Sequence, residues 1–254
     1  METIVDIFGK EYGFCRSYKC SNDHKHKRMV KIAVRFSELS EKFDRMIEKG
    51  NYVSLYARCA LACKMMMYTG IRIGNEGSAE GYMTKPHPNS KKEPEFVQTY
   101  GLTTLLPEHV MVDMDGSVHL NFLGKKQVEN SFTVKGLLAA QVREVLSTVG
   151  EGETLFEVTV RDLTQFIKRH VGRQFTPKDF RTLRANMCAY EKFSEILKRP
   201  LPATKSEFNA EVKEICTYVS ENLNNTPGVC KKSYIDALLW LELGSVRPVT
   251  KRKR

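Results

Sequence analysis

The stretch that decides the fold runs from residue 109 to residue 134 and reads HVMVDMDGSVHLNFLGKKQVENSFTV. Apolar and polar residues alternate on both sides of Asp115-Gly116, and an Asp-Gly pair between alternating runs is a strong signal for a β-hairpin. A second turn, GKKQ at residues 124–127, leads into a third alternating run at residues 128–134. The sequence therefore predicts a small antiparallel β meander with Lys125 at a hairpin tip.

Helical periodicity flanks this meander on both sides. Apolar residues recur at the helical period from residue 52 up to Gly70 and from residue 163 up to Gly172, and glycine is typical just after the end of a helix. Further helical stripes cover residues 180–190, 208–223 and 235–240, and Tyr234 is expected to open the last of these helices. The predicted fold class is mainly α with a small antiparallel β meander.

Length and composition limit the class of protein. The chain has 254 residues, of which 41% are hydrophobic and 28% charged, as in ordinary globular domains. No run approaches the roughly 18 apolar residues that a membrane span needs, and no N-terminal signal segment is apparent. These features exclude membrane and secreted proteins and predict an intracellular location. We expect a short N-terminal segment at residues 1–50, one main domain at residues 51–244 and a basic tail at residues 245–254.

The seven cysteines do not indicate a disulfide framework, because their number is odd and their spacing irregular. Cys15 and Cys20, followed by His24 and His26, could ligate zinc, but their spacing fits no common zinc finger and no second pair follows. We therefore expect no zinc site. No carboxylate cluster indicates a two-metal site, and no Walker loop or dinucleotide-binding glycine pattern is present, so we expect no metal and no cofactor. The residues from His24 to Arg28 are expected to form an exposed basic segment.

The charge balance points to an acidic partner. The chain carries 40 Lys and Arg against 30 Asp and Glu, a formal net charge of +10. Nucleic acid is the default partner of such a protein, although a basic surface that only keeps the protein soluble is common. The tail around residues 251–254 could contact phosphates, serve as a nuclear address or remain a solvated end.

The helix predicted to begin at Pro177 could bind a phosphate. Lys178, Arg181 and Arg184 lie three residues apart and share one face of its first two turns. The unpaired N–H groups and positive dipole end of a helix N-terminus favour an anion at the same place. A solvated basic face would show the same pattern, so both interpretations stay open from these residues alone.

Two further residues could take part in phosphate chemistry. Arg72 stands between two isoleucines directly after a helix end, so that apolar anchors would hold the backbone and aim the guanidinium away. Tyr234 follows the pair Lys231 and Lys232. A surface arginine and a half-buried packing tyrosine are the plainer interpretations. Together with Lys125, these residues suggest a site where a tyrosine attacks a phosphate.

At this point the chain resembles the type IB DNA topoisomerases, in particular the poxvirus and bacterial branch. The resemblance covers about residues 40–240. The motifs that carry it, in chain order, are YTGIRIGNE at residues 68–76, TYGLTTL at 99–105, FLGKK at 122–126, TPKDFRT at 176–182 and TPGVCKKSY at 226–234.

The resemblance implies a role for each matching residue. Tyr234 would attack a DNA phosphodiester and form a 3′-phosphotyrosyl link, and Lys125 would be the general acid for the departing 5′-oxygen. Arg72 and Arg181 would stabilise the charge on the phosphoryl oxygens. No ATP and no metal would be required. DNA contacts are expected from the basic residues around these positions, namely Lys126, Lys178, Arg184, Lys231 and Lys232.

Two departures from the poxvirus pattern matter. Asn225 stands where those enzymes have a histidine, nine residues before the tyrosine, so cleavage is expected to be somewhat slower. Only about 50 residues precede the first clear core helix, whereas the poxvirus-like enzymes have a substantial N-terminal β domain. In those enzymes the N-terminal domain closes over the duplex as a clamp. The resemblance therefore implies a monomer that binds double-stranded DNA more weakly than they do, or a second chain that completes the clamp.

Two other functions stay open. A tyrosine recombinase has a related fold and the same nucleophile, but usually carries a His-x-x-Arg box where this chain reads Lys178-Asp179-Phe180-Arg181. A non-catalytic or degenerate DNA-binding protein would fit the short N-terminal segment, but not the presence of all four implied catalytic residues. The expected location is DNA-associated; nucleus, nucleoid, viral factory and virion are not distinguished.

Overall fold

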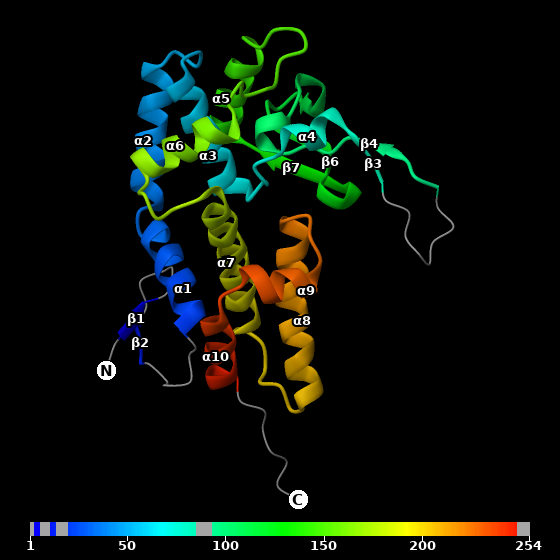
Figure 1. The fold of residues 1–254 in the computed structure, drawn as a ribbon. Helices are drawn as coiled ribbons and strands as arrows, with labels where there is room; N and C mark the ends of the chain where they lie inside the picture. The colour runs from blue at the N-terminus through cyan, green and yellow to red at the C-terminus, as the bar shows by residue number, and fades with distance from the viewer. Residues whose placement is uncertain (1–2, 6–10, 14–19, 85–92, 248–254) are drawn as a thin grey trace, which may run out of the picture. The chain divides into compact units, whose positions relative to one another are not determined.

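The computed structural model describes residues 3–5, 11–13, 20–84 and 93–247, with the backbone alone at 3–5, 11–13 and 20–24. Helices dominate the described chain, and a three-stranded antiparallel sheet accompanies two short strand pairs (Figure 1). The predicted fold class is confirmed. The chain divides into two compact units: unit 1 comprises residues 1–37 and 178–254, and unit 2 comprises residues 38–177. The predicted domain of residues 51–244 is a different division and stays a prediction.

Unit 2 is built around one central helix. That helix, α3, begins after Ser54, whose hydroxyl accepts a hydrogen bond from the Ala57 amide, and ends at Gly70 in the left-handed conformation (φ 67°). Its middle is buried on all sides, including Lys64, which donates to the Gln141 side chain at 3.0 Å and pairs with Asp44. The helices of this unit are α2 (Phe36–Lys49), which begins at the end of unit 1, α3 (Leu55–Thr69), α4 (Glu76–Glu80), α5 (Gly136–Leu146) and α6 (Val160–His170).

The predicted meander is present in unit 2. Strands β5 (Val110–Val112), β6 (Val118–Gly124) and β7 (Val128–Val134) are antiparallel in that order, and Val118 pairs with both neighbours. Gly116, at φ 78°, allows the first turn. Val118, Leu120 and Phe122 point into the core from β6. The unit also contains β3 (Tyr82–Met83), β4 (Phe96–Val97), and three 3₁₀ turns, η1 (Leu102–Thr104), η2 (Pro107–His109) and η3 (Lys125–Gln127).

Unit 1 joins the beginning of the described chain to its end. Its elements are β1 (Thr3–Val5), β2 (Glu11–Gly13), α1 (Cys20–Ala33), α7 (Pro177–Ile196), α8 (Lys205–Asn222), α9 (Pro227–Val229), the π-helical turn η4 (Cys230–Tyr234) and α10 (Ala237–Val246). The apolar residues of α7, among them Phe180, Leu183 and Phe193, form the core with Ile215, Val219 and Leu239 from α8 and α10. Within the described chain, no helix combines the length and apolar character that crossing a bilayer demands.

The prediction that Tyr234 opens the last helix is wrong. Tyr234 closes the π-helical turn η4, and α10 begins only at Ala237. Asp236 has an extended backbone conformation and its carboxylate accepts a hydrogen bond from the Leu238 amide at 3.1 Å, so it is the N-cap that sets the helix start. Tyr234 therefore lies in a non-α segment between two helices.

Candidate active site

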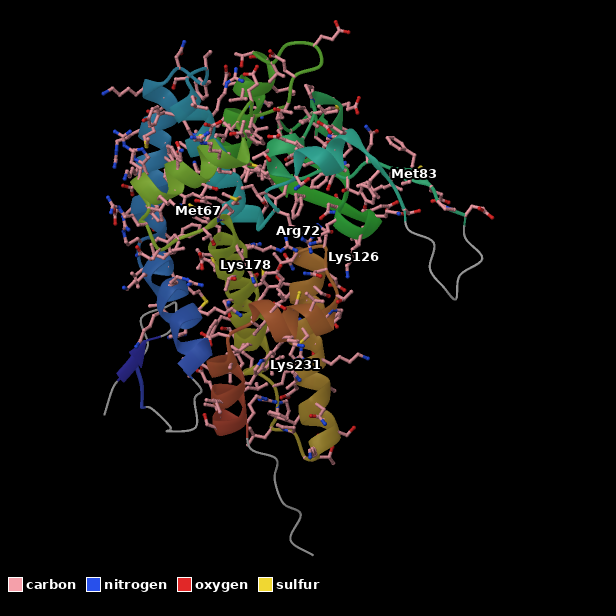
Figure 2. All side chains as sticks on the ribbon, viewed as in Figure 1. Met67, Arg72, Met83, Lys126, Lys178 and Lys231 are labelled. Carbon is pink, nitrogen blue, oxygen red and sulfur yellow. The ribbon has the colours of Figure 1, made fainter. Side chains whose placement is uncertain are left out.

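Arg72, labelled in Figure 2, lies in unit 2 on a backbone segment that accepts hydrogen bonds from η1. The Arg72 carbonyl accepts a hydrogen bond from the Leu102 amide at 2.8 Å, and the Ile73 carbonyl accepts from the amide and the hydroxyl of Thr103, both at 2.7 Å. Ile71 is buried, and the Arg72 side chain is partly exposed. The segment after α3 is thus tied to η1, which gives the guanidinium a rigid support.

Two glycines allow this backbone contact. A Cβ atom on Gly101 would lie only 2.5 Å from the Gly74 nitrogen and 2.8 Å from the Arg72 carbonyl oxygen. Gly74 itself has φ 102°, a conformation that side chains rarely adopt. The sequence does not reveal either glycine as a support of the site, although both stand within quoted motifs. Their only signal is a small residue among bulkier ones.

Lys125 lies where the sequence predicts it, in the tight turn between β6 and β7. The turn is unusual because the two residues that follow Lys125 within it, Lys126 and Gln127, both have positive φ values, 65° and 58°. Non-glycine residues adopt this conformation at a cost, so the ladder on either side, from Gly124↔Val128 onward, must hold the turn in place. Lys125 and Lys126 are exposed, which leaves both ammonium groups accessible to a ligand.

Arg181, in unit 1, is not part of a solvated face. It is only 3% exposed, whereas Lys178 is exposed and Arg184 partly exposed. One terminal nitrogen of its guanidinium donates a hydrogen bond to the Leu223 carbonyl at 2.6 Å, at the end of α8. The guanidinium carbon lies 5.3 Å from the centroid of the Tyr234 ring, within the range of a cation–π contact. The structure therefore brings a permanent positive charge to the ring of this tyrosine.

The backbone around Tyr234 is held by a residue that the sequence did not reveal, Asn186 on α7. Its side-chain nitrogen donates to the Tyr234 carbonyl at 3.0 Å and to the Thr182 carbonyl at 2.7 Å, and its side-chain oxygen accepts from the Asp236 amide at 2.7 Å. Asn186 is fully buried. A buried amide with all three contacts satisfied fixes the segment that carries the tyrosine. A single asparagine in a helix carries no sequence signal for such a contact.

Asn225 lies in the same unit, between α8 and α9. Its backbone amide donates to the Ser220 carbonyl at 2.9 Å, and its side-chain oxygen accepts from the Thr226 amide at 3.0 Å. Its side-chain nitrogen is shielded from solvent and meets no acceptor in the described part of the chain. A shielded donor that lacks an acceptor is costly to the folded state.

The remaining predicted DNA-binding lysines of unit 1 line a small cavity. Lys231 and Lys232 are exposed, and they surround a space of about 190 Å³ together with Lys25, Asp236 and Trp240. The pKa of Lys25 is lowered, mainly because the side chain is buried and also by the charge of Lys178, while the Asp236 carboxylate opposes this shift. Lys25 also donates a hydrogen bond to the Ser233 carbonyl at 2.8 Å, which makes it a further basic group near Tyr234. The labelled residues Lys178 and Lys231 can be located in Figure 2.

The possible zinc ligands are only partly described. Cys15 lies outside the described residues, and so do the side chains of Cys20 and His24. His26 is buried and pairs with Asp236, so the expectation of an exposed basic segment is wrong at this residue. Among the residues that the structure describes, no three His, Cys, Asp or Glu side chains form a metal-binding group. Cys59 and Cys63 are buried in α3, as expected for core residues.

Each unit thus contains part of the predicted site. Unit 1 holds Tyr234 and Arg181 in contact, with Asn225 on the connection that follows α8. Unit 2 holds Arg72 and Lys125, on the η1-bound segment and on the β6–β7 turn. The convergence of all five on one phosphate stays a prediction.

The sequence of this chain matches the model of a known protein family. The model of the catalytic core of eukaryotic DNA topoisomerase I matches residues 16–239. The chain therefore belongs to the type IB DNA topoisomerase family and contains its catalytic core.

A curated relative agrees with this assignment. The chain is 28% identical over 151 residues to DNA topoisomerase 1B of Acanthamoeba polyphaga mimivirus. The match covers 54% of this chain and 45% of the relative, so the chain spans about half the length of the protein it matches.

Proposed function

We propose that this protein relaxes supercoiled double-stranded DNA by cutting and resealing one strand, without ATP and without an obligatory metal. Family membership supports a reaction on DNA. The observation that carries the finer proposal is the contact between Arg181 and Tyr234, which provides a fixed cation beside the expected nucleophile. The surrounding exposed lysines suit the phosphates of a duplex.

The proposed reaction exchanges one phosphodiester bond for another. The phenolic oxygen of Tyr234 gives its proton to solvent water and attacks the phosphorus, and the bond from phosphorus to the 5′-oxygen breaks. The 3′-end of the cut strand is then linked to Tyr234, while Lys125 gives a proton to the departing 5′-oxygen. Resealing is the reverse. Because the two ester bonds are of similar energy, the cycle needs no external energy source.

Positive charge is the main requirement of this chemistry. A phenol with a pKa near 10 is a weak nucleophile at neutral pH, and an alkoxide is a poor leaving group. Attack by the phenol and departure of the 5′-oxygen therefore both require assistance from positively charged groups. Arg72 and Arg181 would bind the phosphoryl oxygens as charge builds up on them, and Lys125 would act as the general acid. Asn225 would donate its unpaired N–H to the same oxygens without adding charge.

Further parts of the proposal concern binding. Lys126, Lys178, Arg184, Lys231 and Lys232 would contact DNA phosphates. The protein would act on DNA as a monomer, or with a second chain that helps to enclose the duplex, and it would be DNA-associated inside the cell.

Incubation with supercoiled plasmid in EDTA, stopped with denaturant, tests the function. We expect relaxed plasmid and a covalent protein–DNA adduct, and neither product with Tyr234→Phe. Relaxation by Tyr234→Phe would refute the nucleophile. A wild-type protein that binds DNA without forming an adduct would instead identify a DNA-binding member that has lost activity. Recombination between specific sites in place of random relaxation would identify a recombinase.

A further inference from the structure

We propose that helix α1 is a positioning element for the nucleophile, and that His26 and Lys25 hold the segment of residues 233–236 in the geometry needed for attack. This inference rests on the proposed function, since it assumes that Tyr234 reacts. It assigns a role to a helix that precedes the five motifs quoted in the sequence analysis.

Two contacts join α1 to the segment on either side of Tyr234. The Lys25 ammonium donates a hydrogen bond to the Ser233 carbonyl at 2.8 Å, one residue before the tyrosine. The Nδ1 atom of His26 pairs with the Asp236 carboxylate, two residues after it. These contacts span 208 and 210 residues of sequence. Tyr234 is thus bracketed by side chains from one helical turn of α1.

The His26–Asp236 pair is buried, with side chains only 3% and 5% exposed. Removal of one partner of such a pair leaves a buried polar group unsatisfied, which is more costly than the loss of a surface contact. Arg28, on the same helix, adds a hydrogen bond to the Asp179 carboxylate at 3.0 Å, at the start of α7. Helix α1 is therefore fixed both to the nucleophile segment and to the helix that carries Arg181.

Asp236 is the point where these restraints meet. One carboxylate oxygen pairs with His26, the other accepts from the Leu238 amide as the N-cap of α10, and the Asp236 amide donates to Asn186. The orientation of this residue is thus specified from α1, α7 and α10 at once. A change at His26 would release one of these restraints two residues from the nucleophile.

The segment needs such restraints because of its own conformation. Tyr234 ends a π-helical turn, a rare form that is often found at functional sites, and it is followed by the extended residues Ile235 and Asp236. Neither conformation continues the regular ladder of an α-helix. The direction of the Tyr234 side chain therefore depends on tertiary contacts, and α1 supplies two of them.

The role is one of positioning, because the contacts of Lys25 and His26 go to a backbone carbonyl and a carboxylate. A displacement of about 1 Å at a reacting group can lower a rate on the order of 10²-fold. We therefore expect the cleavage step to be affected while the binding of DNA is nearly unchanged.

The test measures adduct formation in a single turnover at saturating duplex DNA, and DNA affinity separately. The variants are His26→Ala, His26→Gln, Lys25→Met and Lys25→Arg in the full chain, with Lys31→Met, an exposed lysine of the same helix, as control. We expect His26→Ala to lower the cleavage rate on the order of 10²-fold. Lys25→Met should lower the rate by a smaller factor. Gln and Arg, which retain a donor, should recover much of the rate. Lys31→Met should match the wild type.

A second measurement does not depend on activity. Amide hydrogen exchange of residues 233–236 should become faster in His26→Ala, while exchange in the β meander of residues 110–134 should not change. If His26→Ala proves unable to fold, Lys25→Met carries both measurements.

The outcomes separate the two proposals. A wild-type chain that forms no adduct contradicts the proposed function, and hydrogen exchange then still decides whether α1 restrains the segment. A wild-type chain that forms the adduct, with His26→Ala and Lys25→Met cleaving at the same rate, overturns the positioning role. Equal losses in cleavage and in DNA affinity, or a rate that Gln and Arg do not recover, would also overturn it.

Discussion

The two units hold their parts of the candidate site in different ways. In unit 2, Lys125 is exposed on a turn whose shape is set by adjacent residues, and Arg72 lies on a segment bound to η1 about 30 residues away. In unit 1, Arg181 is buried, and the Tyr234 segment is held by Asn186 and by α1 across 48 and more than 200 residues of sequence. Unit 2 therefore positions Arg72 and Lys125 through residues at most about 30 positions away in the sequence. Unit 1 positions Tyr234 through residues that are much further away.

After removal of the nucleophile itself, the largest effect is expected at Lys125, the exposed cation of unit 2. Lys125→Ala removes the proposed general acid, and a positioned acid typically contributes about 10² to 10⁴ in rate. Because the side chain is exposed on a turn, its loss should leave the melting temperature nearly unchanged. Single-turnover cleavage and thermal melting check both halves of this prediction. A threefold change in rate corresponds to about 0.6 kcal/mol in activation free energy. A cleavage rate within threefold of the wild type would therefore show that Lys125 is not the general acid.

The two arginines separate the units most clearly. Loss of one preorganised charge donor typically costs about 10² to 10³ in rate, so Arg72→Ala and Arg181→Ala should lose similar amounts of cleavage. Only Arg181→Ala should also lose stability, by about 1–3 kcal/mol, because it leaves the Leu223 carbonyl without its buried donor. Chemical denaturation of the two variants measures this contrast. Equal stabilities would show that burial of Arg181 has no structural role.

Gly101→Ala tests the backbone support of Arg72 without changing any charged residue. The added Cβ would collide with the Gly74 backbone, so the contact between the two segments must open. We expect a loss of about 1–3 kcal/mol in stability, as for overpacking, and a cleavage rate lowered by up to about 10²-fold. Gly77→Ala, where the nearest atom would be 3.6 Å away, is the matched control. A Gly101→Ala protein of wild-type rate and stability would contradict the tight contact.

A smaller effect, in the opposite direction, is expected at Asn225. Histidine at this position could donate a charged hydrogen bond to the phosphoryl oxygen, and charged bonds exceed neutral ones by roughly 1 kcal/mol. Asn225→His should therefore raise the cleavage rate by about fivefold. The rate should be measured at a pH below about 6.5, because the introduced imidazole is then mostly protonated. An unchanged or lowered rate would contradict the view that Asn225 slows the enzyme.

Lys126 should show the smallest effect. It is exposed next to Lys125, and its proposed role is a phosphate contact only. Lys126→Ala should leave the cleavage rate at saturating DNA unchanged and reduce the salt dependence of binding by about one phosphate contact. Titrations at several salt concentrations measure this slope. A large loss of cleavage would instead place Lys126 in the reaction.

The same contrast explains what could be predicted from the sequence. The meander, the end of α3 at Gly70 and the turn at Lys125 follow from local signals, namely alternation and turn residues, and the structure confirms them. The burial of Arg181 and the contacts of Asn186 and His26 could not be predicted, because they depend on partners far away in the sequence. The sequence wrongly predicts Tyr234 at a helix start, because apolar periodicity does not reveal a π-helical turn.

The most direct test of the account is the identity of the residue bound to DNA. The adduct formed by the wild-type chain on a duplex would be trapped with denaturant and digested with trypsin, and the DNA-linked peptide sequenced by mass spectrometry. The account predicts a single peptide that contains Tyr234, joined through its phenolic oxygen to the 3′-end of the cut strand. A link to another residue, or to the 5′-end, would contradict it.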